Sequence, residues 1–245
     1  ENPHNNVVYP SDNPAERLVW EQIRFRDPSS SVIPDDIRRK ELMFAKTLPV
    51  NKSLNKSSWI HRGPYNVGGR TRAIALDIQN ENVILAGGTS GGMFRSIDGG
   101  QTWIMTTDPG QLHNVTCLTQ DTRLGHENTW YFGSGENRGG WLGDVSFLGN
   151  GIYKSIDGGL SWDSLSITTS NTPQSWDNDF DFVWNIVTDP SNDSLDIVYA
   201  AVHGDIYKSS DGGISWEKKL GGINSSYYQY TSIEIANNGV VYAAI

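Results

Sequence analysis

Ser96-Ile97-Asp98-Gly99-Gly100-Gln101-Thr102-Trp103 is an eight-residue stretch that returns twice further along the chain. The copies are Ser155-Ile-Asp-Gly-Gly-Leu-Ser-Trp162 and Ser209-Ser-Asp-Gly-Gly-Ile-Ser-Trp216. Their opening serines follow one another after 59 and 54 residues, and an aromatic, strand-like run precedes each copy. Self-similarity at such a period is typical of repeat folds. We call these three stretches the boxes.

Two more strand-like runs precede each box, and a fourth strand is expected to start at its Trp. Four strands every 54 to 59 residues is the pattern of a β-propeller blade. The sequence therefore predicts an all-β propeller of four-stranded blades, spanning residues 70–106, 114–165, 183–219 and, incompletely, 231–245. The upstream runs are Arg72–Ile78 and Val83–Gly88, Val115–Thr119 and Trp130–Ser134, Val183–Thr188 and Ile197–Val202, and Thr231–Ala236 and Val240–Ala244.

Each box has the residues of a tight hairpin turn. Its Asp can accept hydrogen bonds from backbone N–H groups one to three residues further on, and its Gly pair supplies the positive φ that such a turn needs. A catalytic acid is needed once per site, whereas a structural turn is needed once per blade. We therefore predict a structural role for Ser96, Asp98, Gly100, Trp103, Ser155, Asp157, Gly159, Trp162, Ser209, Asp211, Gly213 and Trp216.

About three and a half blades are present. These cannot close a ring, and an open ring leaves a long unpaired edge. We therefore expect further chain after Ile245 to complete the propeller within a longer protein. The sequence begins with Glu1 rather than Met and shows no signal peptide, so we expect a processed mature form, which fits export.

The composition excludes two classes of partner. The formal net charge is -9 and the pI is about 4.9, and an acidic surface repels the phosphates of nucleic acid and of anionic lipid. No apolar run approaches the length of a membrane span. The only cysteine, Cys117, lies in an apolar alternating run, so we expect it to be a small buried core residue.

The pattern S-x-D-x-G-x-[ST]-W in the boxes resembles the Asp-box, or bacterial neuraminidase repeat, propellers. That family includes sialidases, sortilin-type receptor domains, xyloglucanase-type hydrolases and a photosystem assembly factor. The resemblance covers roughly residues 59–245. It implies the propeller fold, but not one activity, because the same blades serve enzymes and binding proteins.

A narrower resemblance rests on two motifs in front of and within the first blade. They read Trp59-Ile-His-Arg-Gly-Pro-Tyr-Asn-Val-Gly-Gly-Arg-Thr-Arg72 and Ala86-Gly-Gly-Thr-Ser-Gly-Gly-Met-Phe-Arg95. They look like those of large exported Bacteroidota proteins that end in a sorting domain of the type 9 secretion system. This resemblance implies a secreted or cell-surface protein, with secretion or attachment machinery as a partner through a domain beyond these residues.

Two enzyme families of this fold can be compared residue by residue. Arg70 or Arg72 lies about where sialidases carry the first arginine of their triad, but the surrounding Gly-Gly-Arg-Thr-Arg differs from the sialidase motif. We expect Arg70 to be a strand-start arginine bonded to backbone carbonyls. In the xyloglucanase-type hydrolases a catalytic Asp precedes the Gly-Gly of the first blade. Thr89 stands at that position here, which argues against the activity.

Residues 1–58 do not fit the blade pattern, and we expect a helical arm and linker ahead of a propeller at residues 59–245. Asn13-Pro14-Ala15-Glu16 has the residues of a helix start. A second helix is expected after Pro34, ending by Pro49. The arm either packs across the propeller or docks another protein.

Two long loops give the candidate binding site. The alternation of loops between the two faces of a propeller places Gly135–Asn150 and Ser166–Phe182 next to one another, on the face opposite the boxes. Long loops on a rigid scaffold commonly carry function. Exposed Trp rings with nearby carboxylates suit sugar binding. The candidate residues are Glu136, Arg138, Trp141, Asp144, Trp176, Asp177, Asp179 and Asp181.

No cofactor is expected from the sequence, except that the alternating acids of residues 177–181 could supply oxygen ligands to calcium. Our leading hypothesis is a non-catalytic extracellular binding or adhesion propeller, with a glycan or an extracellular protein as ligand. One alternative is a divergent glycoside hydrolase whose acid pair comes from the long loops, for example Glu136 with Asp181. The other is a sortilin-like receptor domain for proteins.

Overall fold

The computed structural model describes residues 19–20, 22–24, 26–34, 36–48, 69–108, 110–111, 114–136, 147–170, 172, 175–222 and 230–245. The chain divides into two compact units, residues 1–46 and residues 47–245. The predicted boundary between residues 58 and 59 lies outside the described residues and stays a prediction.

The first unit contains the helix predicted after Pro34, which is α2 (Ile37–Thr47). Residues 19–20 and 22–24 are also helical, whereas the predicted start of that helix at Asn13–Glu16 lies outside the described residues. Arg39 Nε lies 2.6 Å from the carboxylate of Asp36 at the first turn of α2. The apolar side chains of Trp20, Ile23 and Phe44 are each more than half exposed. The docking role proposed for the arm stays a prediction.

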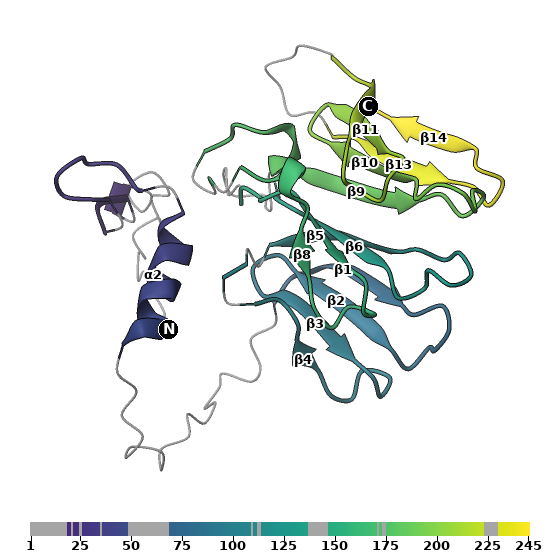
Figure 1. Cartoon of the computed structure of the whole chain (residues 1–245), viewed down its shortest axis with the longest axis horizontal. Helices are drawn as coiled ribbons and strands as arrows, with labels where there is room; N and C mark the ends of the chain where they lie inside the picture. The colour runs from purple at the N-terminus through teal and green to yellow at the C-terminus, as the bar shows by residue number, and fades with distance from the viewer. Residues whose placement is uncertain are drawn as a thin grey trace, which may run out of the picture. The chain divides into compact units, whose positions relative to one another are not determined.

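The second unit consists of antiparallel sheets that follow one another along the chain (Figure 1). Three sheets have four strands each, in the simple order one-two-three-four, and a two-stranded sheet follows. This is the strand order of propeller blades, so the chain contains part of a β-propeller. The strands are β1 (Thr71–Leu76), β2 (Ile84–Gly88), β3 (Gly92–Ser96), β4 (Ile104–Met105), β5 (Val115–Gln120), β6 (Trp130–Ser134), β7 (Ile152–Ser155), β8 (Asp163–Ser164), β9 (Val183–Thr188), β10 (Val198–Val202), β11 (Asp205–Ser209), β12 (Glu217–Leu220), β13 (Ser232–Ile235) and β14 (Val241–Ala244).

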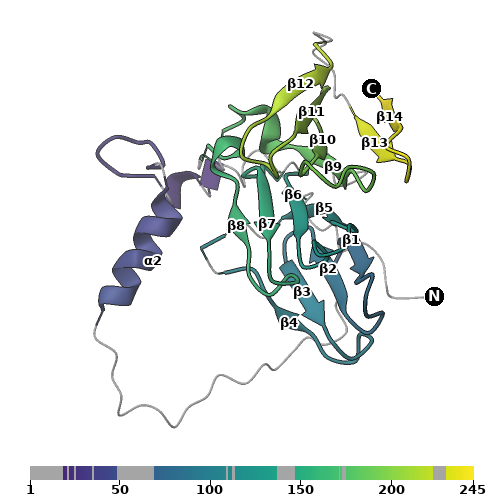
Figure 2. The ribbon, with the colours of Figure 1, turned by 45° about the vertical axis from the view of Figure 1, so that its right-hand side comes forward.

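The predicted strands are present with small differences at their ends. The outermost strands differ most, because β4 and β8 have only two residues and begin after the box Trp rather than at it. The connection between β8 and β9 contains two short 3-10 helices, η2 (Ser166–Thr168) and η3 (Asp179–Asp181). β13 and β14 lie beside the third sheet in both views (Figures 1 and 2).

The hydrophobic core lies between successive sheets. Leu85 and Met93 of the first sheet cluster with Phe132, Tyr153 and other side chains of the second. The rings of Phe132 and Tyr153 stack with centroids 4.6 Å apart. Such a pair contributes about 0.5–1.5 kcal/mol beyond the burial of its area. Each sheet therefore depends on its neighbours for its stability.

Cys117 belongs to the next core, between the second and third sheets, as expected for a small buried side chain. Burial raises the pKa of its thiol to about 12. The thiolate is thus inaccessible near neutral pH, which argues against a nucleophilic role.

The first box is held together by its own side chains. Ser96 Oγ donates to Asp98 Oδ1 (2.8 Å) and accepts from Gly100 N (2.9 Å). Asp98 also accepts from Thr102, through the backbone N (2.9 Å) and the hydroxyl (2.6 Å). The Asp therefore reaches four residues along the chain, one further than predicted, because the positive-φ glycine pair curls the turn back onto it.

The second and third boxes repeat this arrangement. Asp157 accepts from Ser161 N at 3.0 Å, and Asp211 accepts from Ser215 N at 2.9 Å. The six glycines of the three pairs all have positive φ, as predicted. Each box acid therefore accepts hydrogen bonds from donors of its own turn, and the structural role of the boxes stays a prediction.

The boxes lie beside the turns that join the first two strands of each sheet. Gly99 N donates to Asn82 O (3.0 Å), and Gly158 N donates to Asn128 O (2.9 Å). We call this end of the sheets the box face. The opposite end, the loop face, carries the connections between sheets and the turns between the second and third strands.

Candidate functional site

The two long loops predicted to carry the site meet on the loop face. Gly149 N, near the end of the loop that follows β6, donates to Asp181 O in the connection before β9 (2.8 Å). A Cβ at Gly135 would collide with the same carbonyl, so the backbones approach closely there. Arg138, Trp141 and Asp144 lie outside the described residues, and their role stays a prediction.

Glu136 anchors the start of the first long loop. Its backbone exchanges two hydrogen bonds of 2.7 Å with Phe147. Its carboxylate forms an ion pair with Arg70 and lies 3.2 Å from Arg72 Nη1. The side chain is 0% exposed. Glu136 therefore fastens the loop to the start of β1, and in this arrangement it cannot contact a ligand, contrary to its place among the candidate binding residues.

The acids of residues 177–181 are also committed to the protein. Asp181 is buried and accepts from the backbone N of Asp177 and Asn178 (both 2.9 Å), which caps η3. Burial raises the pKa of Asp181. Asp179 accepts from Tyr207 Oη (2.5 Å), and Asp177 accepts from Thr172 Oγ1 (2.6 Å). These carboxylates serve different donors, which argues against the calcium site considered from the sequence.

Trp176 belongs to a row of rings on the loop face. Its side chain is 55% exposed, and its ring meets His203 edge-on at 4.6 Å and Phe182 at 5.4 Å. Phe182 stacks with Trp184 at 6.4 Å, and Trp184 contacts Tyr230 at 4.8 Å. Tyr230 is also 55% exposed. We call these five residues the aromatic row.

The aromatic row offers two half-exposed rings that are supported from behind by buried or partly buried ones. Burial lowers the pKa of His203, so its ring is neutral at pH 7 and acts as an aromatic wall rather than a cation. Trp184 Nε1 is buried, and no described residue forms a hydrogen bond with it. Flat apolar surfaces with a few polar groups beside them are typical of small-molecule sites.

Sequence reasoning identified Trp176 and missed the other four residues of the row, which are Phe182, His203, Trp184 and Tyr230. His203 lies in the tight turn between β10 and β11, which shares the loop face with the long loops. The alternation rule would have included it had it been applied to short turns as well as long ones. The contact of Trp184 with Tyr230 joins the third sheet to the connection before β13, and no local pattern reveals it.

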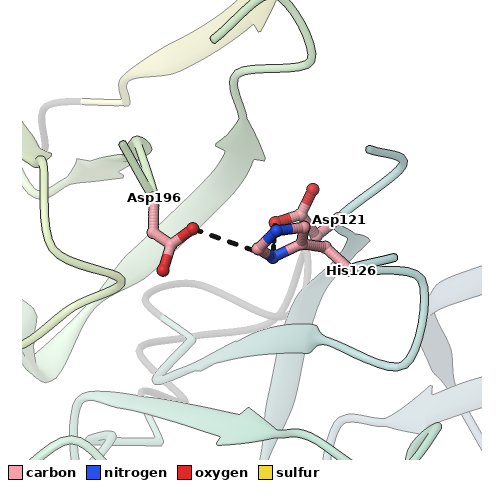
Figure 3. Close-up of side chains that lie close together, drawn as sticks. All are labelled: Asp121, His126 and Asp196. Carbon is pink, nitrogen blue, oxygen red and sulfur yellow. Dashed lines mark ion pairs between the residues drawn. The ribbon is translucent and has the colours of Figure 1, made fainter. Parts of the chain in front are cut away.

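A second cluster of ionisable groups lies on the box face. Asp121, His126 and Asp196 each place a potential ligand atom within 4.8 Å of the other two (Figure 3). Arg123 already bonds both carboxylates, at 2.6 Å to Asp121 Oδ2 and 2.6 Å to Asp196 Oδ1. Its Nη1 also donates to the carbonyl of Leu195 (2.9 Å).

The positive charge of the Arg123 guanidinium argues against metal binding at this cluster. The hydrogen bond from Arg123 lowers the pKa of Asp196, and the bond to Asp121 raises the pKa of Arg123. A metal ion at the cluster would face this buried cation. We therefore assign the cluster to structure: it links the second sheet to the third, and we call it the Arg123 link.

No helix in the described part of the chain is long and apolar enough to cross a membrane.

Comparison with known proteins gives partial matches. No family model matches the chain. Xyloglucanase Xgh74A of Acetivibrio thermocellus is 28% identical over 167 residues, which cover 62% of this chain and 18% of that enzyme. The crystal structure of an ancestral GH74 enzyme aligns with a TM-score of 0.51 and 24% identity, over 71% of this chain and 22% of the other.

An auxiliary nutrient binding protein from Bacteroides thetaiotaomicron aligns with a TM-score of 0.47 and 12% identity, over 72% of this chain and 36% of its own. The chain thus spans less than a quarter of the xyloglucanase and of the GH74 enzyme that it matches. The alignment with the GH74 enzyme supports the propeller fold.

Proposed function

We propose that this chain is a glycan-binding part of an extracellular propeller protein, and that sugars bind at the aromatic row. The observation that carries the proposal is the pair of half-exposed rings, Trp176 and Tyr230, at the two ends of a packed series of aromatic side chains. The faces of pyranose rings are apolar, so they bind to flat aromatic surfaces of this kind.

The charges around the row favour a neutral glycan. Asp177 and Asp179 are exposed near Trp176, and the chain as a whole has a formal net charge of -9. Carboxylates accept hydrogen bonds from sugar hydroxyls, but they repel uronic acids and sialosides. A neutral polysaccharide is therefore the ligand class that fits.

The acid pair considered from the sequence, Glu136 and Asp181, is buried, which argues against hydrolysis by these two residues. Glycoside hydrolysis generally needs two carboxyl groups that flank the scissile bond, and both Glu136 and Asp181 are buried. Thr89, at the position of the xyloglucanase acid, donates through its hydroxyl to Arg70 O (3.2 Å). The similarity to a xyloglucanase keeps hydrolysis by a longer protein as the second candidate function, and release of reducing sugar from xyloglucan would test it.

The proposal includes export of the protein and its attachment to the cell surface through further sequence. A protein ligand, as in sortilin-like domains, is the alternative to a glycan ligand. A protein ligand predicts saturable binding to secreted proteins that soluble polysaccharide does not displace. A glycan ligand predicts saturable binding to polysaccharide that secreted proteins do not displace.

The test is affinity electrophoresis and calorimetry of residues 1–245 against neutral polysaccharides, including xyloglucan, with an anionic polysaccharide for comparison. We expect Trp176→Ala to weaken binding at least about tenfold, because a stacked ring contributes on the order of 1 kcal/mol or more. Trp103→Ala is the matched control, since Trp103 is a 39% exposed Trp of the first box.

Circular dichroism and the unfolding midpoint would establish that both variants fold. Equal affinity of the wild type and Trp176→Ala for every polysaccharide would refute the proposed site. Stronger binding to the anionic polysaccharide would refute the neutral ligand class.

A further inference from the structure

The exposed ring of Trp176 stands on a short turn that one buried carboxyl group holds together. Asp181 Oδ2 accepts hydrogen bonds from the backbone N of Asp177 and of Asn178, both at 2.9 Å. In the same turn, Asn178 Oδ1 accepts from the backbone N of Phe180 (2.9 Å). Asp177 directly follows Trp176 in the chain, so the backbone that carries the ring depends on Asp181.

The surroundings of Asp181 connect this turn to the rest of the loop face. Phe180, on one side of it, is buried in the core between the second and third sheets. Phe182, on the other side, meets the ring of Trp176 at 5.4 Å. The carbonyl of Asp181 accepts from Gly149 N of the first long loop (2.8 Å). Asp181 therefore lies where the two long loops, the core and the aromatic row meet.

The same surroundings disfavour a negative charge on Asp181. The residue is 1% exposed. Its Oδ1 is buried, and no described residue forms a hydrogen bond with that atom. Within the described part of the chain Asp181 has no ion pair, and two further acids, Asp177 and Asp179, lie close to it. Removing a carboxylate from water without a cation beside it is costly, and neighbouring like charges add to the cost.

A proton on Oδ1 removes this cost and keeps both backbone hydrogen bonds, because these bonds end on Oδ2. Burial raises the pKa of Asp181 above its ordinary value of 3.8, and the two backbone hydrogen bonds oppose this only in part. In a released turn the carboxyl group would be in water, where its pKa is ordinary. The packed turn thus binds the proton more tightly than the released turn, so acid favours packing and alkali favours release.

We propose that Asp181 is a positioning residue of the glycan site, and that uptake of a proton at its buried oxygen strengthens glycan binding in mild acid. The inference rests on the proposed function, since Trp176 is the ring that the turn presents. The packed turn holds this ring against Phe182 and His203. Glycan affinity is then proportional to the fraction of molecules in which the turn is packed.

Other groups around the turn also titrate, and the test has to separate them from Asp181. The described titratable side chains in or beside the turn are Asp177, Asp179, Glu136, His203, Tyr207 and Lys218. His203 bears most on the test, because its ring meets Trp176 and gains a proton in acid. A pH effect that belongs to Asp181 disappears with its carboxyl group and persists when other acids are replaced.

The first test uses the ligand-free protein, residues 1–245. Carbon-13 NMR of the Asp181 carboxyl group should give a titration midpoint above 3.8. Hydrogen exchange of the Asp177 and Asn178 amides, corrected for the intrinsic rate, should slow between about pH 7.5 and about pH 4.5. A midpoint at or below 3.8, or corrected exchange rates that do not change with pH, would overturn the proposal.

The second test measures affinity over the same pH range, with xyloglucan or the neutral polysaccharide of the panel that binds most tightly. The wild type should bind about threefold or more tightly at about pH 4.5 than at about pH 7.5. Asp181→Asn is uncharged and has nearly the shape of the protonated residue, so it should bind equally at both pH values, as tightly as the wild type does in acid. Asp193→Asn, at an exposed acid outside the turn, should keep the wild-type profile.

The outcomes separate this inference from the proposed function. A wild-type affinity that does not change with pH would overturn the role of Asp181 and leave the glycan site in place. A pH profile that persists in Asp181→Asn would assign the effect to another group, such as His203, and would overturn the role as well. Absence of binding to every polysaccharide at every pH would overturn both. Should circular dichroism show that Asp181→Asn does not fold, the wild-type titration and exchange rates decide alone.

Discussion

The carboxylates of the boxes are held in their charged form by short local hydrogen bonds. The hydroxyl of Thr102 lowers the pKa of Asp98 to about 2, and that of Ser215 lowers the pKa of Asp211 to about 2. Their ordinary value is 3.8. Between these values the unfolded chain binds more protons than the folded one, so acid favours unfolding. The contribution of these acids is present above about pH 4 and is lost as the pH falls toward about 2.

We therefore expect the thermal midpoint of the propeller to fall steeply between about pH 4 and about pH 2. Replacing both acids, Asp98→Asn with Asp211→Asn, should lower the midpoint at neutral pH and flatten this acid dependence, because an amide does not titrate there. Differential scanning calorimetry across the pH range measures both effects. Asp193→Asn, at an exposed acid outside the boxes, should change neither, and an unaltered acid slope in the double variant would contradict the assignment.

At the scale of elements, the Arg123 link is a polar contact that joins the second sheet to the third. Arg123 and Asp196 are 73 residues apart in sequence, and Asp121 is buried. Removing the guanidinium would leave a buried carboxylate without its main partner. Breaking a buried ion pair in this way costs about 3–5 kcal/mol, whereas an exposed pair is worth about 0–1 kcal/mol.

We expect Arg123→Met to lower the free energy of unfolding by about 3 kcal/mol or more in urea titrations followed by tryptophan fluorescence. Arg39→Met makes the same substitution in the more exposed pair with Asp36 and should cost less than about 1 kcal/mol. Similar losses in the two variants would show that the link adds little to the packing of the sheets.

The elements differ in how far the sequence predicts them. The inner strands and the boxes follow from local patterns, since the serine, the acid and the glycine pair that form each turn lie within five residues of one another. The Arg123 link and the aromatic row do not, because their members meet only after sheets stack. Glu136 is a residue for which the local pattern is misleading. An acid in a long loop suggests a ligand contact, yet the side chain is paired with the arginines at the start of β1.

At the scale of the whole molecule, substitutions of the second glycine of each box can test how tightly neighbouring sheets pack. Gly100 and Gly159 occupy the same position, with φ of 86° and 81°. A Cβ at Gly100 would meet its nearest neighbour, Trp103 of the same box, at an ordinary 3.4 Å. At Gly159 it would collide with Leu85 of the preceding sheet.

The two Gly→Ala variants therefore share one cost and differ in another. Both incur the strain of an L-residue at positive φ, which is about 1–2 kcal/mol. Only Gly159→Ala also pushes two sheets apart, and overpacking of this kind adds about 1–3 kcal/mol. We expect urea denaturation to show a clearly larger loss of unfolding free energy for Gly159→Ala than for Gly100→Ala. Equal losses of unfolding free energy would mean that the contact between Gly159 and Leu85 adds nothing to stability. The box would then stabilise its own blade alone.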